Sequence, residues 1–130
     1  YVPFVLTGSL LVISGQLPLI DGQLPAHLKG KVGGEVSEAH GKEAARLCAI
    51  NVLAQMKVAL GDLERVKRVV RLGGFINAAP GYTALPGIMN GASDLMVEVF
   101  GERGRHARTT VGTALPMDAA AEVEAMIEVA

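Results

Sequence analysis

The residue most suited to chemistry in this sequence is Arg108, which lies in the strand-like run His106–Val111 among small and β-branched residues. Side chains alternate between the faces of a strand, so Arg108 and Thr110 are expected on one face, above small neighbours such as Gly112. A guanidinium over such a floor can hold a small planar carboxylate through two parallel hydrogen bonds. The alternative is a solvated strand arginine, because arginine side chains are mostly exposed.

A second polar pattern occupies the final strand-like run, Ala121–Val129. Its apolar side consists of Val123, Ala125, Ile127 and Val129, and its polar side of Glu122, Glu124, Met126 and Glu128. The apolar side is expected to pack on helices, whereas carboxylates on a sheet face must be solvated, paired or part of a site. We expect this run to form a hairpin with the arginine strand, which would bring Glu122 close to Arg108.

The elements before these runs begin with two β-rich segments. Val2–Leu6 and Leu10–Ser14 flank a turn and predict a hairpin. The second segment is apolar without alternation, which predicts a strand covered on both faces. Residues 17–36 are rich in proline and glycine and predict a loop, with a short strand at Gln16–Ile20.

Two helices are predicted further along the chain. Ser37 can cap the first, and Gly61 is suited to its carboxyl end. Its apolar positions recur every three or four residues at Ala45, Cys48, Val52, Met56 and Ala59. The second helix is expected to begin at Pro86 or Gly87 and to end at Phe100.

Between the helices, Val66–Ile76 is rich in β-branched residues and predicts a strand. Adjacent Lys67 and Arg68 break its alternation, so we expect a bulge or an exposed edge there. The order strand, strand, helix, strand, helix, strand, strand predicts an α+β fold in which both helices pack on one face of a mixed sheet. We expect one domain, residues 1–130.

Composition excludes several classes of protein. The chain has 130 residues, of which 50% are hydrophobic, but no apolar run approaches the roughly 18 residues of a membrane span. A net charge of -1, few aromatic residues and no tryptophan argue against a nucleic-acid partner. The single cysteine, Cys48, is expected to be a buried, inert thiol, which fits a reducing compartment. We expect no signal peptide and a cytoplasmic location.

The sequence lacks the complete motifs of several enzyme classes. His27, His40 and His106 are scattered without the spacing of metal ligands, so no metal site is expected. The glycine pairs lack the lysine and hydroxyl of a phosphate-binding loop. Ser14 lacks a nucleophile-elbow pattern around it. The basic residues of 65–71 are expected to form a solvated edge rather than an RNA contact.

Three short motifs and one asparagine occur in a characteristic order along the chain. They are Ser14-Gly15-Gln16, then Asn90, then Ala107-Arg108-Thr109, and finally Glu122-Val123-Glu124-Ala125. In this order and spacing the sequence resembles the Rid family of reactive-intermediate deaminases, also called YjgF-like proteins. The resemblance covers essentially the whole chain, and it implies a chorismate-mutase-like α+β domain that assembles as a homotrimer with a cleft at each subunit interface.

The activity that this resemblance implies is hydrolysis of enamine or imine intermediates, released by pyridoxal-phosphate enzymes, to a 2-keto acid and ammonia. Arg108 matches the family arginine that holds the substrate carboxylate, and Glu122 matches the acid that positions or activates water. The reaction requires only a held substrate, a nearby water and the transfer of one proton, so no cofactor is expected.

The resemblance also implies residues that line the cleft. Tyr1 matches a cleft tyrosine, Ser14 and Gly15 match the wall at the end of the second strand, and Asn90 matches a cleft asparagine. Thr110 faces the same side as the arginine, at a position where many members of the family have a cysteine.

The sequence leaves other functions open. The loops at Gln23–Gly34 and Gly73–Tyr82 are longer than is usual in the family, and they alter the expected walls of the cleft. One alternative is a trimeric protein that binds or senses a small carboxylate metabolite without chemistry. Another is ribonuclease activity or translation inhibition, as in some relatives, which the small aromatic content disfavours.

Overall fold

The computed structural model describes residues 1–130. Its strands are β1 (Phe4–Thr7), β2 (Leu10–Gln16), β3 (Val66–Ile76), β4 (Ala107–Gly112) and β5 (Ala121–Val129), and its long helices are α1 (Glu38–Leu60) and α2 (Leu85–Phe100). Single-turn 3-10 helices lie at Ala26–Leu28, Leu63–Arg65, Gly101–Gly104 and Pro116–Asp118.

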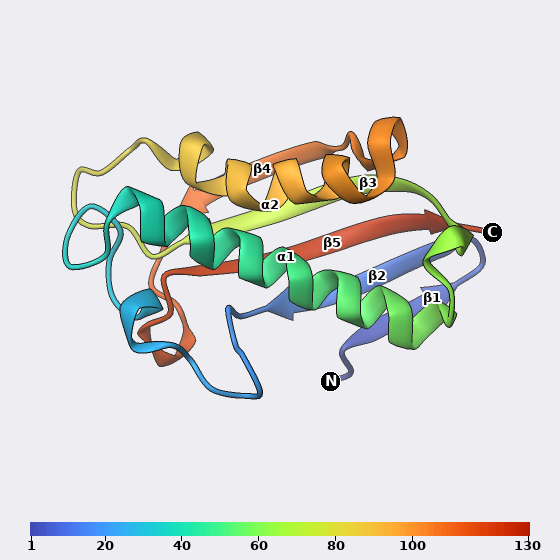
Figure 1. The fold of residues 1–130 in the computed structure, drawn as a ribbon, viewed down its shortest axis with the longest axis horizontal. Coiled ribbons are helices and arrows are strands. Elements are labelled where there is room, and N and C mark those ends of the chain that lie inside the picture. Colours follow the sequence, from blue (N-terminus) through green and yellow to red (C-terminus); the bar gives the residue numbers. More distant parts are fainter.

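The five strands form one mixed sheet in the order β1-β2-β5-β3-β4. Both helices lie side by side across the same face of this sheet (Figure 1). The main core lies between the two layers and is formed by aliphatic, alanine and methionine side chains. The predicted α+β fold, with a mixed sheet and both helices on one face, is confirmed.

Helix α1 begins and ends at the residues that its sequence predicts. The Ser37 hydroxyl accepts a hydrogen bond of 3.1 Å from the His40 backbone N–H, and Gly61 ends the helix with a φ of 77°. Cys48 is buried in the core, and burial raises the pKa of its thiol well above the usual value, as expected for an inert cysteine. Neither helix is both long and apolar enough to cross a membrane.

The predicted hairpin between the last two strands is wrong. Strand β4 pairs in parallel with β3 at the edge of the sheet, and β5 lies between β2 and β3. Parallel neighbours need a long crossover, and α2 provides it between β3 and β4. The whole apolar side of β5 is buried beneath the helices, as suits a central strand.

Strand β3 contains the irregularity that its charged pair predicts. The register between β3 and β5 shifts between Val66 and Arg68 and again between Val69 and Arg71. Each shift is a bulge or similar irregularity that lets adjacent charged residues avoid the core.

No strand forms at Gln16–Ile20, in contrast to the prediction. Strand β2 ends at Gln16, and the following residues run alongside α1. The Asn51 side chain donates hydrogen bonds to the carbonyl oxygens of Leu17 and Leu19, at 2.8 and 3.1 Å. These carbonyl groups are therefore satisfied by a side chain instead of a neighbouring strand, while Pro18 has no N–H to offer.

The sheet face opposite the helices is uncovered in the single chain. Leu11 and Ile13 of β2 point into the core and are buried, whereas Leu10 and Val12 point to the other face and are partly exposed. The expectation that β2 is covered on both faces is therefore wrong for one chain. Val5 and Met126 flank Val12 on this face, which gives it an apolar centre.

Gly91 should be essential to the packing of α1 against α2. A Cβ at this position would overlap the backbone carbonyl oxygen of Lys42, which cannot move without bending α1. We expect Gly91→Ala to lower the free energy of unfolding by about 2 kcal/mol, as measured by urea unfolding at fixed protein concentration.

The matched control is Gly87→Ala on the same helix, where a Cβ has open space. This change should be neutral or stabilising by up to about 1 kcal/mol, because alanine is the better helix former. Equal effects of the two substitutions would contradict the proposed role of the Gly91 contact.

Candidate functional site

Arg108 is held by hydrogen bonds to three acceptors of α2. Its Nη1 donates to Asn90 Oδ1 at 2.9 Å and to Ser93 Oγ at 3.0 Å, and its Nη2 donates to the Pro86 carbonyl oxygen at 3.3 Å. The guanidinium has five N–H groups, so the Nε–H and one Nη2–H have no acceptor within the chain. These are the donors from which an arginine can form a pair of hydrogen bonds to a carboxylate.

The local structure explains why these groups meet. Asn90 and Ser93 are three residues apart on α2 and therefore lie on one side of the helix. Arg108 pairs with Leu72 of β3, whose side chain belongs to the core beneath the helices. The Arg108 side chain consequently rises from the helix-covered face of the sheet, at its β4 edge, and reaches α2.

Ser93 also contacts His106, a pair that sequence reasoning missed. Ser93 Oγ lies 2.8 Å from His106 Nε2, and His106 Nδ1 lies 2.6 Å from the Gly104 carbonyl oxygen. Two spacings could have indicated this cluster: Ser93 is three residues after Asn90, and His106 is two residues before Arg108, on the same side of the strand.

These side chains border a shallow hollow of about 870 Å³. Its lining is almost entirely polar and consists of Asn90, Ser93, Asp94, Val97, Glu98, Arg105, His106 and Arg108. The hollow is wide enough for a small organic anion, with Arg108 in its wall.

Thr110 follows Arg108 on the same face of β4, as predicted. Its hydroxyl oxygen is buried and has no hydrogen-bond partner in the chain. It pairs with Gly74 of β3, over which the Met89 side chain lies. A buried hydroxyl without a partner is unusual, because its desolvation costs about 1–3 kcal/mol.

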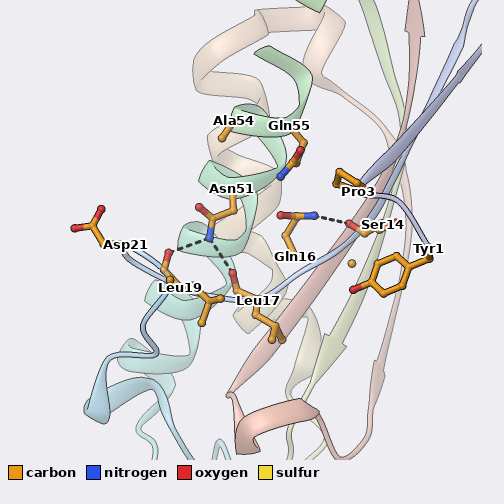
Figure 2. Close-up of a pocket in the computed structure, with 12 residues that line it drawn as sticks. Tyr1, Pro3, Ser14, Gln16, Leu17, Leu19, Asp21, Asn51, Ala54 and Gln55 are labelled. Carbon is orange, nitrogen blue, oxygen red and sulfur yellow. Dashed lines mark hydrogen bonds between the residues drawn. The ribbon is translucent and has the colours of Figure 1, made fainter. Parts of the chain in front are cut away.

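The other predicted site residues form a second group near the other edge of the sheet, where β2 lies. Tyr1, Ser14 and Gly15 help to line a hollow of about 560 Å³ between β2 and α1. Figure 2 shows the Tyr1 ring and Ser14 on one side of this hollow and Asn51 of α1 on the other. Ser14 donates its hydroxyl proton to the Val2 carbonyl oxygen at 2.7 Å, which ties down the chain next to Tyr1.

Glu122 lies beside this second group, on the sheet face without helices. Its carboxylate occupies the space that a Cβ at Gly15 would take, so the glycine is required for this close approach. Burial raises the pKa of Glu122, and the negative charge of Glu124 raises it further. Glu124 itself forms an ion pair with Arg71 at 3.2 Å.

Within one chain, the two groups do not share a cleft. Arg108, Leu72 and Ala125 are aligned across three strands on the helix-covered face, whereas Val111, Phe75 and Glu122 are aligned on the other face. The expected proximity of Glu122 to Arg108 depended on the hairpin and is wrong for the single chain. The structure places Arg108 in hydrogen-bond contact with Asn90, and the Glu122 carboxylate against Gly15.

The fold agrees with a family of small α+β proteins. The family model described as "YjgF/chorismate_mutase-like, putative endoribonuclease" matches residues 1–128. The chain therefore belongs to the YjgF family, as its motifs predict.

Individual relatives are similar over most of this chain. Protein TCP17 of Trypanosoma cruzi is 52% identical over 103 residues, which are 78% of this chain and 64% of that protein. The chain thus spans just under two thirds of the length of this relative.

Two solved structures have the same fold in detail. The protein Atu1372 of Agrobacterium tumefaciens, whose function is described as unknown, has a TM-score of 0.96 and 45% identity over 100% of this chain and 82% of its own. A protein of Shewanella oneidensis, described as "a putative endoribonuclease", has a TM-score of 0.93 and 35% identity over 99% of this chain and 85% of its own.

The environment of Glu122 predicts a pH-dependent stability. Because the pKa of Glu122 is raised in the folded state, its ionisation opposes folding. The stability that protonated Glu122 contributes is fully present below its unfolded-state pKa and is lost as the pH rises through the folded-state pKa. We therefore expect Glu122→Gln to stabilise the protein relative to the wild type at about pH 7, and to lose this advantage near pH 4.

Urea unfolding across this pH range would measure the effect. Glu128→Gln is the matched control, because Glu128 lies on the same strand and face but is exposed. The expected ionisation behaviour would be contradicted if the gain in the free energy of unfolding from Glu122→Gln did not grow with pH. It would also be contradicted if Glu128→Gln gave the same gain.

Proposed function

We propose that this protein hydrolyses small enamine and imine intermediates of the 2-aminoacrylate type to a 2-keto acid and ammonia. The observation that carries this proposal is the hydrogen bonding of Arg108, which leaves two guanidinium N–H groups free beside an open polar hollow. In that position the arginine is suited to bind a substrate carboxylate and to fix its orientation. Asn90 would fix the guanidinium. Thr110 would lie behind the arginine and not in contact with the ligand, because its hydroxyl is buried and it does not line the hollow.

Glu122 is the group proposed to handle water. In the reaction, 2-aminoacrylate is protonated on carbon to give the imine, water adds to the imine carbon, and the resulting carbinolamine releases ammonia to leave pyruvate. A carboxyl group with a raised pKa is suited to these steps, because it can give up and regain a proton closer to neutral pH. The steps transfer protons, add water and release ammonia without any net oxidation or reduction, and so require no cofactor.

Arg108 and Glu122 must meet between copies of the chain, because they lie on opposite faces of one sheet. A homotrimer is the proposed assembly, with Arg108 of one copy facing Tyr1, Ser14, Gly15 and Glu122 of the next. Such a head-to-tail contact between unlike surfaces closes into a ring of three when each copy is rotated by a third of a turn from the last. The uncovered sheet face, with its apolar centre, offers the area that such contacts would bury.

The same arginine supports a second candidate, a trimeric binding or regulatory protein for a small carboxylate metabolite. This function needs Arg108 and the hollow but no reaction at Glu122. Ribonuclease activity is less well supported, although the family description and the Shewanella relative carry that name. The chain has only 4% aromatic residues and a net charge of -1, which offer little to RNA.

A coupled assay tests the proposed reaction. The purified protein is added to a dehydratase that releases 2-aminoacrylate, and pyruvate and ammonia are followed against the spontaneous rate. We expect acceleration by the wild type, with kcat/KM lowered at least about 100-fold in Arg108→Ala because the carboxylate is no longer held. Glu122→Gln should lower kcat by about 100-fold and change KM little.

The matched control is Lys57→Ala, which removes an exposed basic residue of α1 away from the hollow and should keep full activity. Light scattering on the same samples should give a trimer. Failure of the wild type to accelerate imine hydrolysis, together with pyruvate binding that Arg108→Ala abolishes, would favour the binding protein. Cleavage of labelled RNA that requires neither Arg108 nor Glu122 would overturn both functions.

A further inference from the structure

Arg108 is the end of a longer chain of hydrogen bonds that the proposed reaction does not account for. The chain runs from the Gly104 carbonyl group through His106 and Ser93 to the Arg108 guanidinium, with contacts of 2.6, 2.8 and 3.0 Å. Its members come from the turn after α2, from the start of β4 and from α2 itself.

For a neutral His106, the direction of every hydrogen bond in this chain is determined by the Gly104 carbonyl group. The Gly104 carbonyl oxygen can only accept, so His106 Nδ1 carries the proton. In a neutral imidazole Nε2 is then an acceptor, and the Ser93 hydroxyl must donate to it. With its only proton directed at His106, Ser93 Oγ presents its lone pairs to Arg108 Nη1.

The opposite histidine tautomer would weaken the arginine contact. His106 Nε2–H would then donate to Ser93 Oγ. The Ser93 hydroxyl proton would have to point elsewhere, and where it pointed toward the positively charged guanidinium it would oppose the hydrogen bond from Arg108. The position of the Gly104 carbonyl group therefore matters. Gly104 is buried, and a Cβ there would overlap the Met96 carbonyl oxygen of α2, so this turn is fixed against the helix.

We infer that Ser93 and His106 are positioning residues that hold the Arg108 guanidinium ready for a carboxylate. Ser93 and Asn90 together occupy both Nη1 hydrogens, and Pro86 occupies one on Nη2. The guanidinium is thereby fixed in rotation, with the Nε and Nη2 edge left for the ligand. Preorganisation of this kind raises affinity because less side-chain freedom is lost on binding. The inference rests on the proposed carboxylate-binding role of Arg108.

Pyruvate binding to the full chain, measured by calorimetry, tests this arrangement. Ser93→Ala removes the acceptor for Arg108 and should weaken binding about 10-fold, as expected for one hydrogen bond to a charged group. His106→Ala should weaken it about 3- to 10-fold, since the Ser93 hydroxyl then becomes free to turn. In the imine assay, both changes should raise KM and leave kcat nearly unchanged.

Two further variants separate positioning from loss of structure. His106→Gln supplies a side-chain carbonyl oxygen that can accept from Ser93, and it should restore most of the affinity. The double variant of Ser93→Ala with His106→Ala should bind no more weakly than Ser93→Ala alone, because His106 acts only through Ser93. Ser9→Ala and His40→Ala, which change residues away from the hollow, should bind as the wild type does.

Arg108→Ala distinguishes failure of this inference from failure of the proposed function. If Arg108→Ala binds pyruvate as the wild type does, the carboxylate site is wrong and the role of Ser93 and His106 falls with it. If Arg108→Ala loses binding while Ser93→Ala and His106→Ala retain it, the site stands and the positioning role is overturned. Multiplied effects in the double variant would likewise overturn the role of His106 through Ser93.

Discussion

The parallel pairing of β3 with β4 is the constraint on which the candidate site depends. A parallel neighbour can be reached only by crossing over one face of the sheet, and α2 makes that crossing. The crossing places Asn90 and Ser93 directly above the strand that carries Arg108. An antiparallel hairpin at this position would have needed no helix above it, and the guanidinium would have had no acceptors from α2.

The same pairing separates the arginine from the acid. Paired residues of neighbouring strands share a face, so the alternation along β4, β3 and β5 assigns Arg108 and Glu122 to opposite sides. In the proposed reaction, a single copy of the chain would therefore supply half of a site on each face of its sheet. The proposed chemistry therefore requires an assembly of several copies. The uncovered sheet face would be buried in the contacts of that assembly.

Much of the fold could be predicted because its signals are local. Ser37 and Gly61 bound α1 through hydrogen bonds and backbone angles that involve only their own neighbours in sequence. Strand β5 was equally clear from its alternation. The neighbour of β4 was not, because period-two patterning assigns residues to faces but does not say which strand lies alongside. The crossover rule for a strand, a helix and a strand, applied to β3, α2 and β4, would have predicted the parallel pair.

The site was predictable to a smaller extent. The resemblance indicated Arg108 and Asn90, which the structure brings into contact, but no motif contained Ser93 or His106. These two residues are 13 positions apart in sequence and become partners only through the turn that follows α2. Recognition of such a pair requires the path of the chain, whereas spacing rules detect pairs within one helix or strand.

Thr110 is a position at which the chain is less stable than its fold allows. Its enclosed hydroxyl lacks any partner in the chain, so an aliphatic residue of similar shape would make the interior more robust. Engineering for heat resistance would naturally begin there. Because Thr110 does not line the hollow, such a change would leave Arg108 and its contacts with α2 in place, so heat resistance would be gained without loss of the carboxylate-binding side chain.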